Sequence, residues 1–282
     1  MGLLMSEGGR QGVESLLPRD LLSDATVFIS GGGSGVNLGI ATVLADLGAK
    51  LAICGRTEST LEAAAELLRS RGANVVTAVA DVRDAAAVDS AFKLTEDALG
   101  PVTGVVCGAA GNFAAAAQDI SSNGFRAVVD IDLIGSFHTA NAAFDQLRRT
   151  RGALLFVTGG QSRMPFAFQA HVGAAKAGVD QLMRSLALEW GRYGIRSNSI
   201  MPGPVTGTEG MKRLGEGPGL AAWTDSVPLG RFAEPAEIGR MAAVLLSPIA
   251  SYVSGAVIAV DGGLDLTGSS LVNNSTMKNT TP

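Results

Sequence analysis

The chain has 282 residues, of which 46% are hydrophobic and 17% charged, so it is long and apolar enough to bury the core of one large α/β domain. The formal net charge of −4 and the lack of a basic run argue against nucleic acid as the main partner. The N-terminus lacks the pattern of a signal peptide, and no apolar run approaches the roughly 20 residues that span a membrane. We therefore expect a cytoplasmic protein with no membrane partner.

The two cysteines, Cys54 and Cys107, both lie in apolar runs. They give neither a disulfide framework nor the spacing of a metal site, which fits a reducing compartment. We expect no bound metal.

Short apolar segments rich in β-forming residues recur along the chain and alternate with helical patterns. Near-continuous apolar strands separated by amphipathic helices are typical of a parallel sheet covered on both faces. The sequence therefore predicts an α/β fold with a doubly wound parallel sheet. The expected strands are residues 25–30, 50–55, 74–80, 103–108, 153–158, 195–200 and 256–260.

Two of the intervening helices have recognisable ends. Apolar residues recur at helical spacing over 36–47, and Gly48 follows them as a helix terminator. The next helix is expected to begin at a capping box formed by Ser59 and Glu62, and to end near Gly72.

The pattern indicates one domain with short extensions. Residues 21–265 form the expected domain, residues 1–20 an N-terminal extension and residues 266–282 a flexible tail. Residues 201–234 are rich in glycine and proline and interrupt the alternation of strands and helices. We expect this interval to be a mobile flap over the substrate.

The segment "SGGGSGVNLGIA" at 30–41 stands between a strand and a helix, as a dinucleotide-binding turn requires. Backbone N–H groups and the helix dipole at such a turn favour a pyrophosphate; the alternative is a plain glycine-rich turn. Asn37 stands where such turns usually have a glycine, and we expect its amide to face the cofactor or the catalytic pocket. The predicted cofactor-binding residues of this turn are Gly31, Gly33, Ser34, Gly35, Asn37 and Leu38.

The next two strands bear on the choice of cofactor. The second strand ends in Gly55, where an NAD-preferring enzyme would place an acidic residue. Arg56 follows, and either pairs with a 2′-phosphate or is a solvated surface residue. After the third strand, Asp81 and Val82 either bracket the adenine or, in the case of Asp81, cap the next helix. The sequence favours NADP(H) over NAD.

In this order and spacing, the motifs resemble the short-chain dehydrogenase/reductase family over residues 21–263. The resemblance implies a single-domain Rossmann fold with a seven-stranded parallel sheet, and assembly as a homotetramer. The remaining motifs of the family are "AAG" at 109–111, Lys176, "PGP" at 202–204 and "VDGG" at 260–263. They add to the cofactor-binding residues Ala109, Ala110, Gly111, Lys176, Pro202, Gly203 and Val205.

The catalytic residues depart from the usual pattern of that family. The general acid, a Tyr four residues before the Lys, is replaced by Val172, and its partner Ser by Gly159. The Asn of the central helix becomes Asp132, so only Lys176 is kept. Because general acid catalysis contributes roughly 10²–10⁴-fold, ordinary ketone chemistry is disfavoured. The chain is therefore either a cofactor-binding relic or an enzyme whose substrate does not need this Tyr.

Five segments resemble one branch of the family, the 2,4-dienoyl-CoA reductases of the peroxisomal type, which also lack the Tyr. They are "AAGNF" (109–113), "DIDLIGSF" (130–137), "HVGAAKAGVD" (171–180), "LALEWG" (186–191) and "PGPVTGTEGMKRLG" (202–215). The resemblance implies an NADP-dependent oxidoreductase that reduces a dienoyl thioester in unsaturated fatty-acid oxidation. Hydride reaches the fifth carbon and a proton the second. Another enoyl- or 3-oxoacyl-thioester reductase and a relic remain the alternatives.

The resemblance also suggests catalytic roles. Lys176 would order the nicotinamide ribose and add positive potential. Asp132, in an apolar stretch, would relay a proton, unless it meets only backbone or water. Gln161 would donate to the oxyanion, and His171 would relay a proton unless it is structural.

Four residues are expected to contact the acyl-CoA. Asn112 and Phe113 would position the thioester, or else are a turn Asn and a core Phe. Lys212 and Arg213 would meet the CoA phosphates, or else are a solvated pair.

Overall fold

The computed structural model describes residues 16–208 and 219–269. Seven parallel strands form one sheet in the order β3-β2-β1-β4-β5-β6-β7, which confirms the predicted doubly wound fold. The strands lie close to the expected positions. They are β1 (Thr26–Ser30), β2 (Lys50–Gly55), β3 (Val75–Val79), β4 (Gly104–Cys107), β5 (Ala153–Val157), β6 (Arg196–Pro202) and β7 (Val257–Val260).

The central strands β1, β4 and β5 are almost entirely apolar because both of their faces are covered, with Thr26 and Ser30 as buried polar residues at the two ends of β1. Successive side chains alternate between the faces. Phe28 therefore belongs to one core, with Phe92 and Phe156, while Ile29 belongs to the other, with Leu44.

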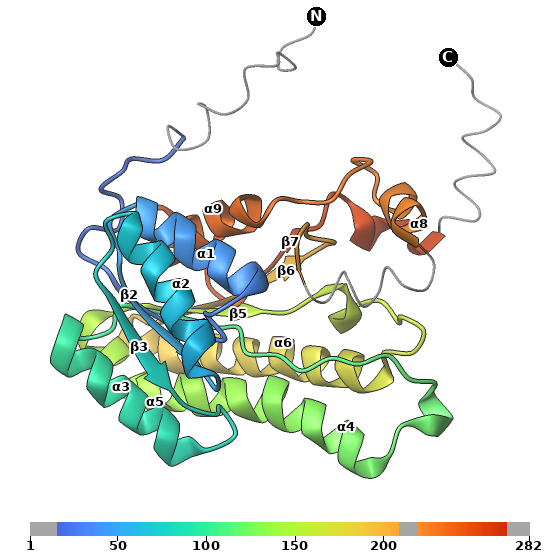
Figure 1. Ribbon diagram of the computed structural model, residues 1–282, viewed down its shortest axis with the longest axis horizontal. Helices are drawn as coiled ribbons and strands as arrows, with labels where there is room; N and C mark the ends of the chain where they lie inside the picture. The colour runs from blue at the N-terminus through green and yellow to red at the C-terminus, as the bar shows by residue number, and fades with distance from the viewer. Residues whose placement is uncertain (1–15, 209–218, 270–282) are drawn as a thin grey trace, which may run out of the picture.

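Helices cover the sheet in two layers (Figure 1). One layer contains α1 (Gly35–Asp46), α2 (Glu58–Ser70) and α9 (Pro235–Leu246), whose buried side chains share the Ile29 core. The other contains α3 (Ala85–Leu99), α5 (Gly135–Thr150) and α6 (Ala170–Trp190), which share the Phe28 core. Helix α4 (Ser122–Val129) continues into α5 through one π-helical segment, Asp130–Ile134, and α8 (Gly219–Ser226) precedes α9.

Helices α1 and α9 pack closely because glycines face each other's helix. A Cβ on Gly39 would overlap Pro235, and a Cβ on Gly239 would lie 2.6 Å from Val43. Helix α9 begins at a capping box in which the Glu237 side chain accepts the N–H of Glu234. The packing of α9 against α1 fixes the position of α1, which begins where the glycine turn ends.

One expectation about helix starts is wrong, and the alternative role of Asp81 as a helix cap is excluded. Helix α2 begins at Glu58 with Thr57 as its N-cap, and the Glu62 side chain accepts a hydrogen bond from the Thr77 hydroxyl at 2.6 Å, so Ser59 and Glu62 form no capping box. The N-cap of α3 is Asp84, which accepts the N–H groups of residues 86 and 87.

The two ends of the predicted flap lie side by side. The Ala233 N–H donates to the Pro204 carbonyl, and the Thr206 N–H donates to the Ala233 carbonyl, each at 2.9 Å. Helix α8 lies within this interval, whereas Lys212 and Arg213 fall outside the described residues. The start of the predicted tail is helical, because residues Leu264–Ser269 form a 3-10 helix, η6. The domain bounds otherwise stay predictions.

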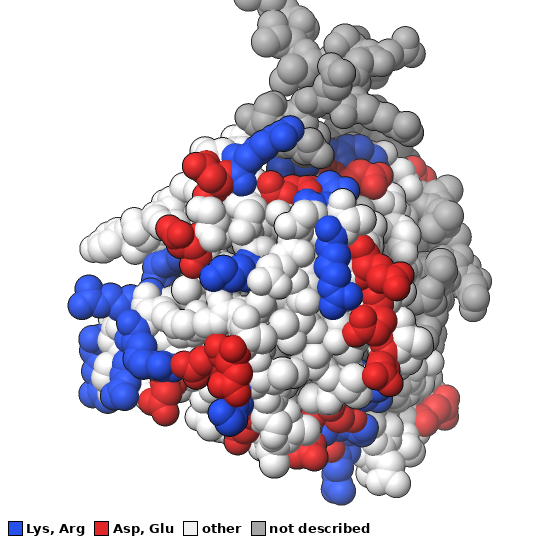
Figure 2. All heavy atoms as spheres, turned by 60° about the vertical axis from the view of Figure 1, so that its left-hand side comes forward, with Lys and Arg blue, Asp and Glu red and all other residues white. Residues whose placement is uncertain are grey.

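In the described part, no helix is long and apolar enough to cross a membrane. Figure 2 shows acidic and basic side chains side by side over most of one face, with broad uncharged areas between them.

Candidate active site

The site lies where the carboxyl ends of the strands meet, the usual ligand-binding edge of an open parallel sheet. Two cavities occupy this edge. The first, which we call the turn cavity, has a volume of about 290 Å³ and borders the glycine turn. The second, which we call the central cavity, has a volume of about 190 Å³ and lies beyond the ends of β5 and β6.

The glycine turn brings the chain close to the end of β4. Gly31 has a φ of 71°, and a Cβ there would lie 2.9 Å from the Ala109 Cα. Gly35, also with a positive φ, starts α1. Ser34 makes no side-chain cap bond and the first turn of α1 has no acidic residue, so its N–H groups are available to an anion. Gly33 and Ser34 line the turn cavity.

The Asn37 side chain links the glycine turn to the end of β4 through hydrogen bonds. Its amide nitrogen donates to the Gly31 carbonyl at 3.2 Å and to the Gly108 carbonyl at 2.7 Å. A Cβ on Gly108 would overlap the Asn37 amide, so the two residues require each other. The amide nitrogen is thus engaged with the backbone of two strand ends and does not lie in bulk solvent, and its orientation toward the cofactor or the catalytic pocket stays a prediction.

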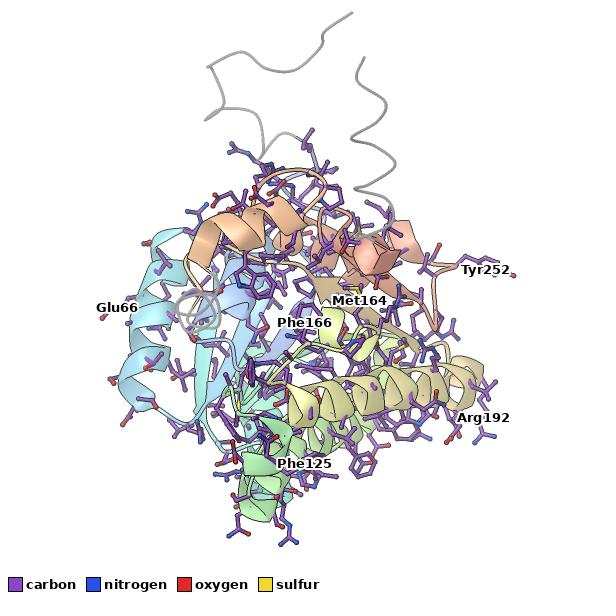
Figure 3. The ribbon with its side chains drawn as sticks, turned by 90° about the vertical axis from the view of Figure 1, so that its right-hand side faces the viewer. Glu66, Phe125, Met164, Phe166, Arg192 and Tyr252 are labelled. Atoms are coloured by element: carbon purple, nitrogen blue, oxygen red, sulfur yellow. The ribbon has the colours of Figure 1, made fainter. Side chains whose placement is uncertain are left out.

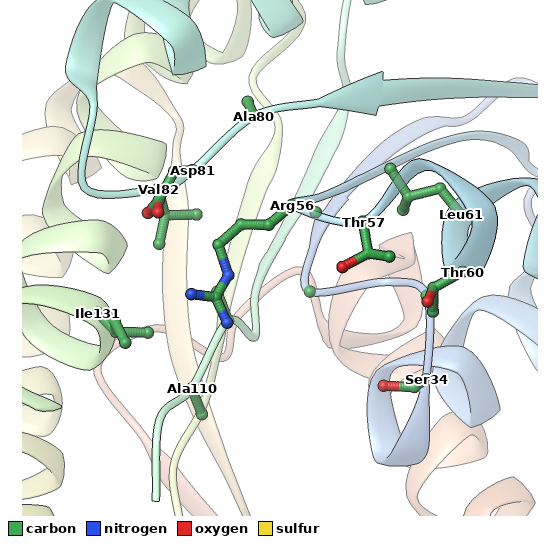
Figure 4. Close-up of a pocket in the computed structure, with 14 residues that line it drawn as sticks. Ser34, Arg56, Thr57, Thr60, Leu61, Ala80, Asp81, Val82, Ala110 and Ile131 are labelled. Atoms are coloured by element: carbon green, nitrogen blue, oxygen red, sulfur yellow. The ribbon is translucent and has the colours of Figure 1, made fainter.

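Arg56 extends into the turn cavity, and its guanidinium lies between Asp81 and Val82 on one side and Ser34 on the other (Figure 4). Among the described residues, none pairs with this guanidinium. Asp81 is bound instead by Arg83, whose hydrogen bonds, together with the charge of Arg56, lower the pKa of Asp81 to about 2. Among the described residues of the turn cavity, the Arg56 guanidinium is therefore available to pair with an anionic ligand.

Asp132 and Lys176 form a buried ion pair. The Lys176 Nζ lies 3.0 Å from Asp132 Oδ2 and donates to the Val157 carbonyl at 3.2 Å. The other carboxylate oxygen accepts the Gly111 N–H at 2.7 Å. Asp132 sits in the π-helical segment between α4 and α5, and such segments are frequent at functional sites. The structure therefore brings together three predicted site residues from β4, the central helix and α6.

The position of the usual general acid carries no acid. Val172 is 3% exposed and packs against Val128 and Ala175. Tyr193 packs on the Phe144 ring, and Tyr252 is fully exposed, so neither tyrosine replaces the missing one.

The His171 and Phe113 rings contact each other near the Asp132–Lys176 ion pair. The His171 ring is completely buried, and its centre lies 4.2 Å from that of Phe113. Burial lowers the pKa of His171, although the Phe113 backbone and the charge of Asp132 oppose this shift. Phe113 also meets Gly124 at the start of α4, and neither ring lines the central cavity.

Five further predicted site residues line the central cavity. It is lined by Asn112, Gln161, Pro202, Gly203 and Val205. Gln161 lies in the short 3-10 helix Gly160–Ser162, and its side-chain oxygen faces Gly159. Leu38 lines neither cavity and packs against the Ile29 core, so the structure does not place it among the cofactor contacts.

The lining of the central cavity also includes residues that were not predicted, among them three large apolar side chains. Phe166, Trp223 and Leu264 come from the loop after β5, from α8 and from η6. The Phe166 and Trp223 rings are stacked, 6.0 Å apart and inclined by 8°. Trp223 lies in the interval 201–234, whose glycine- and proline-rich composition was the signal that predicted a flap over the substrate. Within the described part, no three His, Cys, Asp or Glu side chains group as metal ligands.

Comparisons with known proteins agree with this geometry. Residues 31–265 match the family described as Enoyl-(Acyl carrier protein) reductase. The peroxisomal 2,4-dienoyl-CoA reductase [(3E)-enoyl-CoA-producing] of Saccharomyces cerevisiae is 40% identical over 87% of this chain and 85% of its own length. A Bacillus subtilis protein named probable 2,4-dienoyl-CoA reductase [(2E)-enoyl-CoA-producing] is 39% identical over 84% of this chain and 95% of its own.

A solved structure extends the likeness to the fold. The NADPH-bound short-chain oxidoreductase of Pseudomonas aeruginosa PAO1, described as containing an atypical catalytic center, is 31% identical with a TM-score of 0.81. The match covers 88% of this chain and 98% of that one. This chain therefore belongs to the short-chain dehydrogenase/reductase family of oxidoreductases.

Proposed function

We propose that this protein is an NADPH-dependent reductase that converts a 2,4-dienoyl-CoA thioester to a 3-enoyl-CoA. The observation that carries the proposal is the buried Asp132–Lys176 pair beside Val172, which replaces the usual general acid. A site of this kind suits a reduction that protonates carbon rather than an alkoxide. The names of the yeast and Bacillus relatives support the same substrate class.

The residues of the turn cavity fit an NADP(H) molecule. The uncapped N–H groups at the start of α1 would bind the pyrophosphate, and the open Arg56 guanidinium would pair with the 2′-phosphate. Val82 would contact the adenine, and Lys176 the nicotinamide ribose. When bound, this cofactor supplies the hydride that is added at the fifth carbon of the diene.

The chain's own residues would stabilise the charge that then develops. Electron density moves along the conjugated system to the thioester oxygen, where a preorganised donor contributes ~3 kcal/mol. Asn112 and Gln161 carry amide donors at the wall of the central cavity, and the Lys176 ammonium adds positive potential. Amide donors and the ammonium thus share the stabilisation of the dienolate.

Asp132 would then relay a proton from water to the second carbon, its carboxylate accepting the solvent proton and passing it on, so that it ends the step as a carboxylate again. Its carboxylate is held by the Gly111 N–H and the Lys176 ammonium, so its position is fixed before substrate enters. Protonation at the second carbon leaves the double bond between the third and fourth carbons and completes the balance of one hydride and one proton.

Two alternatives are separable by one assay. The purified protein is incubated with NADPH and, in turn, a 2,4-dienoyl-, an enoyl- and a 3-oxoacyl-CoA, while NADPH absorbance is followed. Our proposal predicts oxidation with the dienoyl-CoA. Turnover only with the other acceptors would indicate a related thioester reductase. NADPH binding without any turnover would indicate a non-catalytic relic.

The compartment and the assembly are proposals as well. We propose a homotetramer, supported by three exposed apolar side chains on the α4–α5 face, Phe125, Ile134 and Phe137. Light scattering of the purified protein would test it. The yeast relative is named peroxisomal and the Bacillus relative is not, so cell fractionation decides whether the cytoplasmic location holds.

A further inference from the structure

A third cavity adjoins the site, and no step proposed above uses it. It has a volume of about 450 Å³ and is here called the tail cavity. Figure 3 shows two of its lining residues, Met164 and Phe166, near the middle of one face, between α6 and the C-terminal part of the chain. It is lined by Met164, Pro165, Phe166, Trp223, Ser226, Leu264, Thr267 and Gly268.

The wall of the tail cavity is apolar. None of the described residues that line it is charged. The Ser226 hydroxyl donates to the Trp223 carbonyl at 2.7 Å, and the Thr267 hydroxyl donates to the Leu264 carbonyl at 2.8 Å. Both hydroxyl protons are already used, so the Trp223 Nε1–H, buried without a hydrogen-bond partner in the described part, is the one side-chain donor left among these lining residues. A nucleotide or a CoA phosphate does not fit this wall, whereas a hydrocarbon does.

The tail cavity adjoins the central cavity. Phe166, Trp223 and Leu264 line both of them. The tail cavity shares no lining residue with the turn cavity. Neither Asp132 nor Lys176 lines the tail cavity. A ligand that spans the central and tail cavities therefore places its far end, and not its reacting carbons, away from the Asp132–Lys176 pair and the charged residues of the turn cavity.

We propose that the tail cavity holds the hydrocarbon tail of the acyl-CoA, from the sixth carbon onward. The inference rests on the proposed function, in which the fifth carbon reacts within the central cavity. The next carbons then pass the stacked Phe166–Trp223 pair and enter the larger space. The protein is accordingly selective for dienoyl-CoA substrates with medium or long tails over the six-carbon thioester, which carries only a methyl group beyond the diene.

The test is a chain-length series. The ratio kcat/KM is measured with 2,4-dienoyl-CoA thioesters of six, eight, ten and twelve carbons. Since burying one CH₂ favours binding by an amount equal to about a fourfold change in affinity, kcat/KM should rise up to about fourfold per added carbon until the cavity is full. Saturated acyl-CoA affinities from calorimetry should follow the same series, which gives a readout independent of turnover.

A matched pair of variants locates the effect. Thr267→Trp fills the tail cavity, while Leu266→Trp adds the same side chain at the neighbouring position, which is 78% exposed. Thr267→Trp should abolish the rise with chain length and leave the six-carbon rate within about threefold, whereas Leu266→Trp should keep the rise. Ser226→Phe is a second filling variant in case Thr267→Trp does not fold, which a thermal melt reports.

Other outcomes would overturn the inference. A flat series in the wild type, or an equal rise in Thr267→Trp and Leu266→Trp, contradicts it. If a protein lacking residues 270–282 gains a rise that the full chain lacks, the cavity holds the chain's own C-terminal residues. If the rise appears only in the dissociated monomer, a second copy covers the cavity. No turnover of even the six-carbon thioester contradicts the proposed function itself, and calorimetry then still reports whether hydrocarbon binds here.

Discussion

The Lys176 ammonium lies 3.0 Å from the Asp132 carboxylate, and both side chains are buried at the point where the π-helical segment meets α6. The backbone holds both partners, through the Gly111 N–H on one side and the Val157 carbonyl on the other. A buried ion pair contributes little net stability against an apolar pair of the same size, although breaking it is costly. Its presence is therefore better explained by chemistry than by folding.

Removing either partner should abolish activity. Asp132→Asn and Lys176→Met are each expected to lower kcat by roughly 10²–10⁴-fold, because proton delivery or stabilisation of the oxyanion is lost. Each should also destabilise the fold by about 3–5 kcal/mol, because one buried charge loses its partner.

The double variant separates these two effects. Asp132→Asn with Lys176→Met should recover most of the lost stability in chemical denaturation while staying inactive toward a dienoyl-CoA. A double variant that regains both stability and activity would contradict the role given to the pair.

His171 should matter less than Asp132. Because burial lowers its pKa, its ring is neutral near pH 7 and is held against Phe113. His171→Phe keeps an aromatic ring at this contact and should leave kcat/KM within about tenfold of the wild type. A loss as large as that of Asp132→Asn would move the proton relay to His171.

Arg56 should set the cofactor preference. Hydrogen bonds to a charged group contribute roughly 1.5–3 kcal/mol, so Arg56→Ala should raise the Kd for NADPH by roughly 10–100-fold and leave that for NADH nearly unchanged. Fluorescence titration measures both. Arg71→Ala, which removes a guanidinium paired with Asp46 away from the turn cavity, serves as the control. Equal losses for NADPH and NADH in Arg56→Ala would count against 2′-phosphate recognition.

Asn37 and Gly108 should be energetically coupled. Gly108→Ala places a methyl group against the Asn37 amide and is expected to cost roughly 1–3 kcal/mol of unfolding free energy. In an Asn37→Ala background that methyl group has room, so the same change should cost clearly less. Denaturant titrations of the four proteins give the coupling energy. Strictly additive costs would mean that the amide does not occupy the position described.

Acid stability should depend on Glu237 at the start of α9. The hydrogen bonds from Arg231 and from the Glu234 N–H lower the pKa of Glu237 from 4.5 to about 2. Its contribution is therefore present above pH 4.5 and is lost as the pH falls toward 2. Because the pair is partly exposed, we expect Glu237→Gln to cost only about 1 kcal/mol at pH 7.

Denaturant titrations across the pH range test this. The difference between Glu237→Gln and the wild type should shrink steadily below pH 4.5. Asp97→Asn, at an exposed pair on α3, should change stability by less than about 0.5 kcal/mol at any pH. A cost of Glu237→Gln that stays constant down to pH 2 would refute the linkage.

The sheet could be predicted from the sequence because its strands are buried on both faces, which makes them continuous apolar runs. The first residues of the helices were harder to predict from the sequence. Ser59 and Glu62 have the spacing of a capping box, yet α2 begins at Glu58, and Glu62 binds Thr77 on β3. A tertiary contact thus overrides a local pattern.

Site residues that stand within a single sequence motif could be predicted. Site residues that come together from distant segments were missed. Asp132 and Lys176 stand in recognisable motifs, so both could be proposed before their contact was known. Phe166 and Trp223 are separated by the whole of α6 and β6, and nothing local indicates that their rings stack. Asn37 was noticed as an exception, but its two carbonyl partners depend on how β4 ends beside the turn.

The most direct test of the account is the product formed from a 2,4-dienoyl-CoA and NADPH deuterated at the nicotinamide C4 position. The account predicts a 3-enoyl-CoA with deuterium at the fifth carbon and a solvent-derived proton at the second, as read by NMR. A protein that binds NADPH but does not reduce the dienoyl-CoA, or a product that carries deuterium at the third carbon, would contradict it.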